Sequence, residues 1–151
     1  KNNIELNFIN SIINSSKKSK NWITEIFLKI YKKYKIKKVS LIGLSYKKNN
    51  SSIKNSPSLN FLKNTNKLNL EINIYDDLIK KYNGKNISNF ESAIENTELV
   101  IFARDFVNSG LFIKQIFSKK SKLKFCIDPF NLVKKEYISN SKIKVFQIGK
   151  K

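Results

Sequence analysis

The feature that most constrains the fold is a regular alternation of short apolar segments with segments of helical period, from about residue 38 to the end of the chain. The apolar segments have the length and composition of strands. Strands and helices that alternate at this spacing predict an α/β domain with a mainly parallel sheet. The predicted strands are 38–44, 70–75, 98–103, 123–127 and 144–148, and the predicted helices between them are 57–65, 90–95 and 111–117.

The N-terminal region has a different pattern. It lacks Pro and Gly and places apolar residues near helical spacing, which predicts a helix over about 4–34. If this helix breaks, we expect the break in the polar stretch 14–21. We therefore predict a helical arm, residues 1–36, followed by a Rossmann-like domain of a mainly parallel sheet flanked by helices, residues 37–151. The chain begins without Met inside a helical pattern, which suggests a fragment of a longer protein.

The charge is strongly basic. A formal net charge of +19, from 30 basic and 11 acidic residues, favours a polyanionic partner. Arg104 is the only arginine, however, and lysine lacks the planar fork that recognises bases and phosphates in a bidentate manner. We therefore interpret most lysines as a solvated surface and expect no specific nucleic-acid site. A stand-alone basic module that binds nucleic acid nonspecifically remains the alternative.

Several kinds of chemistry are excluded by composition. The chain has no histidine and one cysteine, Cys126, so it holds no Ser-His-Asp triad, no Cys-His pair and no His-ligated metal. Cys126 lies in an apolar strand, where a thiol is normally inert packing. No catalytic or metal-binding residue is predicted. No apolar run approaches the roughly 20 residues needed to span a membrane, so we expect a cytoplasmic protein without a membrane partner.

The most informative segment leaves the first predicted strand at Gly43. Parallel sheets bind ligands outside the carboxyl ends of their strands, so the loops after residues 44, 75, 103 and 128 are the places to search. Lys47 follows the strand-end glycine, where an ammonium group can neutralise a phosphate or carboxylate. Two acidic residues lie at the ends of later strands. We expect Asp76 to cap the next helix and Asp128 either to cap the following turn or to touch ligand. Tyr75, beside Asp76, is expected to pack in the core.

The segment 43–58, GLSYKKNNSSIKNSPS, resembles the loop that opens the C-terminal domain of the UDP-glucose/GDP-mannose dehydrogenase family. Further segments resemble the same family in the same order along the chain. They are Ile13-Asn14, Ile74-Tyr75-Asp76, the segment 93–102, Phe125-Cys126-Ile127-Asp128 and Ile148-Gly149-Lys150.

The resemblance implies an NAD-dependent oxidoreductase, like UDP-glucose 6-dehydrogenase, that oxidises the C6 alcohol of a nucleotide sugar to a carboxylate. It also implies a role in polysaccharide biosynthesis. This chain would supply the end of the central dimerisation helix and the UDP-binding domain. The NAD domain and the catalytic cysteine would lie outside it, and the chain has no G-x-G-x-x-G motif. The implied partners are a UDP-sugar, the protein's own N-terminal NAD domain and a second copy in a homodimer. We expect the fragment alone to be inactive.

The resemblance also implies site residues. Tyr46 and Lys47 take substrate-binding positions, and Asn131 falls near a substrate-binding arginine of the family but offers no cation. Lys54 replaces an arginine that reaches NAD across the domain interface, so it keeps the charge and loses the fork. Ser51-Ser52 replace an acidic pair. These departures also suit a decayed enzyme fragment, which is a further alternative.

Overall fold

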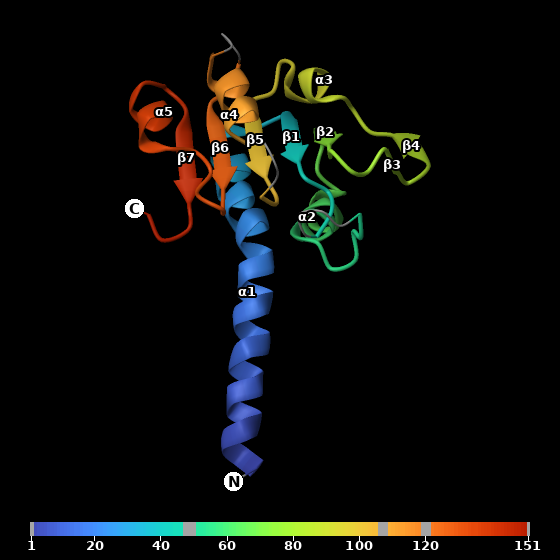
Figure 1. Cartoon of the computed structure of the whole chain (residues 1–151), viewed down its shortest axis with the longest axis vertical. Helices are drawn as coiled ribbons and strands as arrows, with labels where there is room; N and C mark the ends of the chain where they lie inside the picture. The colour runs from blue at the N-terminus through green and yellow to red at the C-terminus, as the bar shows by residue number, and fades with distance from the viewer. Residues whose placement is uncertain (1, 47–50, 106–108, 119–121, 151) are drawn as a thin grey trace.

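The central feature of the fold is a five-stranded parallel sheet with strand order β2-β1-β5-β6-β7. The computed structural model describes residues 2–46, 51–105, 109–118 and 122–150 (Figure 1). The sheet confirms the predicted Rossmann-like class, and the strand positions agree with the sequence to within about two residues. The strands are β1 (Lys38–Ile42), β2 (Glu71–Tyr75), β5 (Leu99–Phe102), β6 (Phe125–Asp128) and β7 (Lys144–Gln147), with a separate antiparallel ribbon of β3 (Lys81–Tyr82) and β4 (Lys85–Asn86).

The strand order creates a switch point in the middle of the sheet. The chain runs from β1 outward to β2 and then returns to the other side of β1 as β5. The connections that leave β1 and β5 therefore diverge to opposite faces of the sheet, since α2 (Pro57–Thr65) packs on one face and α4 (Ser109–Ser118) on the other. Ligands of open α/β sheets bind at such points.

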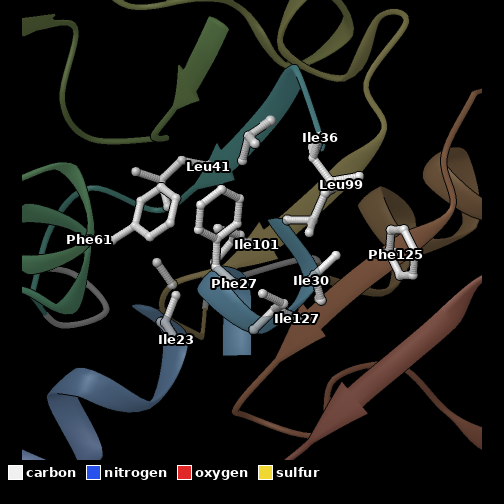
Figure 2. Close-up of a cluster of buried hydrophobic side chains, with 12 residues drawn as sticks. Ile23, Phe27, Ile30, Ile36, Leu41, Phe61, Leu99, Ile101, Phe125 and Ile127 are labelled. Carbon is white, nitrogen blue, oxygen red and sulfur yellow. The ribbon is translucent and has the colours of Figure 1, made fainter. Parts of the chain in front are cut away.

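Helices cover both faces of the sheet. They are α1 (Asn2–Tyr34), α2 (Pro57–Thr65), α3 (Phe90–Ile94), α4 (Ser109–Ser118) and α5 (Lys135–Ser139). On one face, Ile23, Phe27 and Ile30 of α1 and Phe61 of α2 pack against β1, β5 and β6, as Figure 2 shows. On the other face, Phe90, Ile113 and Ile116 are among the residues of α3 and α4 that form a second core. Because both faces are covered, β5 and β6 are fully buried, and their residues are apolar except for Asp128 at the end of β6.

The helix α1 is one uninterrupted helix, so the break considered within 14–21 does not occur. That stretch has no proline or glycine, and none of its side chains is buried where the structure describes them, so they carry little burial penalty. Figure 1 shows the N-terminal part of α1 projecting beyond the sheet, on the side toward which the arrows of β1, β5, β6 and β7 point.

The projecting part of α1 carries exposed apolar side chains. Ile9, Ile12 and Ile13 are 51%, 53% and 44% exposed. The C-terminal part of the same helix belongs to the core, so the arm and the α/β domain are joined without a flexible connection. No helix among the described residues is long and apolar enough to cross a bilayer.

Candidate functional site

The turn that leaves β1 is built around Gly43. Its φ of +96° lies in the region that favours glycine, and a Cβ added there would lie 2.6 Å from Cγ of Arg104. The Gly43 N–H donates to the carbonyl of Tyr75 at 2.8 Å, and the Gly43 carbonyl accepts from the hydroxyl of Ser58. The turn is therefore fixed from three sides, by β2, by α2 and by the segment after β5.

Asp76, directly after β2, fixes the next two residues of the same turn. Its Oδ2 accepts from the N–H of Leu44 at 2.7 Å, the N–H of Ser45 at 3.0 Å and the Ser45 hydroxyl at 3.1 Å. Its Oδ1 accepts from the N–H groups of Leu78 and Ile79 at 2.8 and 3.0 Å. One buried carboxylate thus joins the loops after β1 and β2.

The role of Asp76 differs from the predicted one. The next element after β2 is the strand β3, so Asp76 caps no helix. It instead accepts hydrogen bonds from N–H groups of two loops. Burial by itself raises the pKa of this carboxyl, but the backbone hydrogen bonds, that of Ser45 foremost, outweigh it and lower the pKa from 3.8 to about 2. Asp76 is therefore a carboxylate at neutral pH.

Arg104, two residues after β5, completes the arrangement. Its side chain is only 3% exposed, and its Nε lies 3.5 Å from Oδ2 of Asp76. One terminal nitrogen bonds the carboxylate of Asp77, and the other donates to the carbonyl of Asp105 at 3.0 Å. Loops from three adjacent strands, β2, β1 and β5, are thereby held together at the switch point.

The connection from the turn to α2 places Tyr46. The Tyr46 N–H donates to the carbonyl of Ser52 at 2.8 Å, and the Tyr46 side chain is 41% exposed at the carboxyl end of β1. The helix α2 then begins as predicted, with the Ser56 hydroxyl accepting from the Leu59 N–H at 3.1 Å and Pro57 in the first turn. Lys54 lies in this connection and is exposed. Lys47, the predicted phosphate-binding lysine, lies outside the described residues.

Asn131 lies in the loop that leaves β6 and is exposed, with a φ of +56° that asparagine tolerates well. The loop is fixed by Asp128, whose Oδ2 accepts from the Val133 N–H at 2.8 Å and from Nε2 of Gln147 at 2.7 Å. Asp128 therefore caps the following turn, one of its two predicted roles. Because only β5 separates β1 from β6, the start of this loop lies about 10 Å from the Gly43 turn.

Two further predictions concern packing. Tyr75 packs against Phe90 and Phe112, with ring centroids 5.2 and 5.6 Å away, which confirms its place in the core. Cys126 is fully buried in β6, and burial, with a smaller contribution from Asp128, raises the pKa of its thiol well above the usual value. The thiol is protonated and inaccessible, as expected for packing.

Other hollows on the surface lie away from these residues. One lies beside β2 and the β3–β4 ribbon, one between α4 and α5, and one between α1 and β7. None of the three is lined by Tyr46, Lys54 or Asn131. We place the candidate site at the switch point because parallel sheets bind ligands at the carboxyl ends of their strands, next to such a point. The described residues contain no group of His, Cys, Asp and Glu suited to hold a metal ion.

Comparison with known families now decides the relationship. The model of the UDP-glucose/GDP-mannose dehydrogenase family, UDP binding domain, matches residues 40–135. The match contains the Gly43 turn, Asp76, Arg104 and the loop after β6.

The chain belongs to this family.

Solved structures with the same fold include dehydrogenases of nucleotide sugars. UDP-N-acetyl-mannosamine dehydrogenase Cap5O from Staphylococcus aureus has 22% identity and a TM-score of 0.66, over 87% of this chain and 31% of its own. UDP-D-ManNAc dehydrogenase from Pyrococcus horikoshii has 19% identity and a TM-score of 0.65, over 88% of this chain and 31% of its own. NDP-N-acetyl-D-galactosaminuronic acid dehydrogenase from Methanosarcina mazei Go1 has 16% identity and a TM-score of 0.67, over 86% and 29%.

These comparisons confirm the family and the fold that the sequence motifs indicate. The chain spans about 30% of the length of the dehydrogenases whose structures it resembles. Comparison with curated proteins gave no significant match.

Three residues of this UDP-binding domain were not predicted to act at the site. They are Ser58, which holds the Gly43 carbonyl, and the pair Asp77 and Arg104. Ser58 was part of the matched motif without a role. For Arg104 the sequence did hold a signal, because it is the only arginine among 30 basic residues.

Proposed function

We propose that this chain is the nucleotide-sugar-binding part of an NAD-dependent nucleotide-sugar 6-dehydrogenase, similar to UDP-glucose 6-dehydrogenase. The observation that carries the proposal is the Gly43 turn, fixed by a buried carboxylate at the switch point of a parallel sheet. The family match to a UDP binding domain supports the same ligand class. The full activity, oxidation of the sugar C6 alcohol to a uronate, belongs to a longer protein in this proposal, and the 151-residue chain alone is inactive.

In this proposal the substrate lies across the carboxyl ends of β1, β5 and β6. Tyr46, exposed beside the turn, offers an aromatic face and a hydroxyl to the sugar or the base. Lys47 directly follows and supplies a positive charge for the diphosphate. Asn131, in the loop that leaves β6, contributes an amide that can donate and accept hydrogen bonds but adds no charge.

We assign NAD mainly to a domain outside this chain. The described residues suit only a peripheral contact with it, since Lys54 is an exposed cation in the connection between β1 and α2. Lysine can attract a cofactor phosphate as a point charge without the bidentate geometry of arginine. When bound, NAD would supply the hydride acceptor of the oxidation.

We further propose two protein partners, the protein's own N-terminal NAD domain and a second copy in a homodimer. The exposed isoleucines at positions 9, 12 and 13 support a partner along the projecting part of α1, since three neighbouring apolar side chains are poorly solvated. No membrane and no specific nucleic-acid partner is proposed, and location in the cytoplasm remains a prediction.

Titration of the 151-residue chain with UDP tests the binding proposal. We expect weak binding by calorimetry, with NMR shift changes at Tyr46, and an affinity about tenfold lower in Lys47→Ala, since a charge-assisted hydrogen bond is removed. Lys37→Ala is the matched control, because it removes the same charge at the opposite, amino end of β1. Equal loss in both variants, or no UDP-dependent change near Tyr46, would contradict the site.

The identity of the sugar is a separate question. Two of the structural relatives are named for N-acetylmannosamine substrates and one for an N-acetylgalactosamine derivative. Competition between UDP-glucose and UDP-N-acetylmannosamine for the UDP site measures the preference. The proposed similarity to UDP-glucose 6-dehydrogenase predicts that UDP-glucose competes at least as well as UDP-N-acetylmannosamine. A clear preference for the N-acetylated sugar, the kind for which these relatives are named, would replace UDP-glucose in the proposal.

A further inference from the structure

Arg104 links the loops of the candidate site through contacts with other protein groups. Arg104 is 3% exposed, so its guanidinium is not available to substrate phosphates in this structure. Its stem occupies the space in which a Cβ of residue 43 would lie. Its head contacts both Asp76, which holds Leu44 and Ser45, and Asp77, which follows it.

Arginine suits this arrangement better than lysine would. The guanidinium reaches two carboxylates and the carbonyl of Asp105 from one planar fork. A lysine has a single nitrogen at the end of a flexible stem and cannot span these partners. In a chain where every other basic residue is lysine, the one arginine occurs where the fork has three partners.

We propose that Arg104 is a positioning residue of the substrate site, which holds the Gly43–Tyr46 turn in its binding conformation by tying the loop after β2 to the loop after β5. The inference rests on the proposed nucleotide-sugar site for its functional meaning. Arg104 acts through Asp76 and Gly43 and does not touch the substrate.

The proposal predicts a local effect on the turn that a general loss of stability does not produce. Hydrogen exchange at the amides of Leu44 and Ser45 reports the two bonds that they donate to Asp76. The amides of Ile101 in β5 and Ile127 in β6 report the sheet core. In Arg104→Lys we expect exchange at Leu44 and Ser45 to accelerate about tenfold, while exchange in the core changes little.

A second variant keeps the test decisive if Arg104→Lys folds poorly. Asp77→Asn neutralises the more exposed of the two carboxylates that contact Arg104, and it should produce a smaller change in the same direction. The Asp77 side chain is 31% exposed and that of Asp76 is 0% exposed. Asp105→Asn is the matched control. It removes an exposed carboxylate from the same segment and leaves the carbonyl that Arg104 bonds.

UDP affinity is the functional measurement. We expect Arg104→Lys to weaken UDP binding about tenfold and Asp105→Asn to leave it unchanged. If the unaltered chain binds UDP and Arg104→Lys binds it equally well, positioning is refuted while the proposed function stands. If the unaltered chain binds no UDP, the proposed function fails together with the substrate role of Arg104. Uniform acceleration of exchange at Leu44, Ser45, Ile101 and Ile127 would also overturn the inference, since it would show a purely structural residue.

Discussion

Gly43 combines two demands that no other residue type meets together. Its φ is +96°, and the stem of Arg104 fills the space beside its Cα, so that a methyl group added there would lie 2.6 Å from the Arg104 Cγ. We predict that Gly43→Ala lowers the free energy of unfolding by about 2–4 kcal/mol, from backbone strain and overpacking together. Chemical denaturation followed by circular dichroism measures the change.

Gly84 is the control for this substitution. Its φ is also positive, +75°, but a Cβ there would meet nothing within 4 Å. Gly84→Ala therefore carries the backbone strain alone, about 1–2 kcal/mol. If both substitutions cost the same, the close approach of Arg104 to Gly43 contributes nothing to stability.

Asp76 makes the stability of the domain depend on acidic pH. Its pKa of about 2 in the folded chain lies below the ordinary value of 3.8, so the folded state holds the proton less tightly than the unfolded state. The stabilisation is therefore complete above about pH 5 and is lost as the pH falls through about 2, and it amounts to roughly 2 kcal/mol.

Comparing the unaltered chain with Asp76→Asn separates the pH-dependent stabilisation by Asp76 from that by the other acidic residues. We expect the difference in unfolding free energy between the two proteins to be constant from about pH 5 to 7 and to narrow between about pH 4 and 2. Urea denaturation at each pH supplies the values. A difference that stays constant down to about pH 2 would show that the charge of this carboxyl does not stabilise the loops.

At the scale of elements, two serines at the start of α2 have different roles, one in stabilising the helix and one in shaping the candidate site. Ser56 caps the helix, whereas Ser58, two residues later, bonds the Gly43 carbonyl of the site. We predict that Ser56→Ala and Ser58→Ala each cost about 1 kcal/mol of stability. Only Ser58→Ala should weaken UDP binding, because only that hydroxyl contacts the turn. Calorimetric titration of both variants tests the distinction, and equal affinities would mean that the hydroxyl does not help to shape the turn.

The elements themselves could be predicted where a local signal exists. Apolar runs indicated the central strands, and the short helices α2 and α3 begin at residues whose side chains cap them in the structure, Ser56 and Asn89. The β3–β4 ribbon was not predicted, since strands of two residues carry too little periodicity. The helix α5 was not predicted either: it is as short as α3, but it begins after Lys134 without a side-chain cap and buries no residue fully. The polar stretch of α1 suggested a break because polar residues in a helix can mean either a loop or a solvated face, and pattern alone does not separate the two.

The sequence indicates where the candidate site lies in the sheet, but it does not indicate most of the contacts between the residues of that site. The glycine after β1 and the parallel sheet indicated the carboxyl edge, and Tyr46 and Asn131 lie there. The partner of Asp76 could not be read from the sequence, since its acceptor role depends on β2 lying beside β1 in register. For the same reason the pairing of Arg104 with Asp76 and Asp77 follows from strand order and not from spacing along the chain.

At the scale of the whole molecule, α1 joins two regions with different surfaces. Its C-terminal part is buried against the sheet, while residues 2–20 project by about 30 Å at the rise of an α-helix. The projecting part lies on the side of the candidate site (Figure 1). A partner that packs along this arm would therefore lie on the same side of the sheet as the candidate site.

The exposed isoleucines of this arm allow a direct test of self-association. Ile9, Ile12 and Ile13 share one face of α1 at helical spacing, so helices from two chains can bury them against each other. We predict that the 151-residue chain dimerises at high concentration and that Ile12→Lys shifts it to monomer, because the substitution places a charge in the contact. Asn14→Lys adds the same charge on the opposite face of the same exposed helix and should leave the dimer intact. Light scattering across a concentration series measures the mass. If the chain is a monomer at all concentrations, or if both variants dissociate equally, the apolar face binds another partner and not a second copy of this chain.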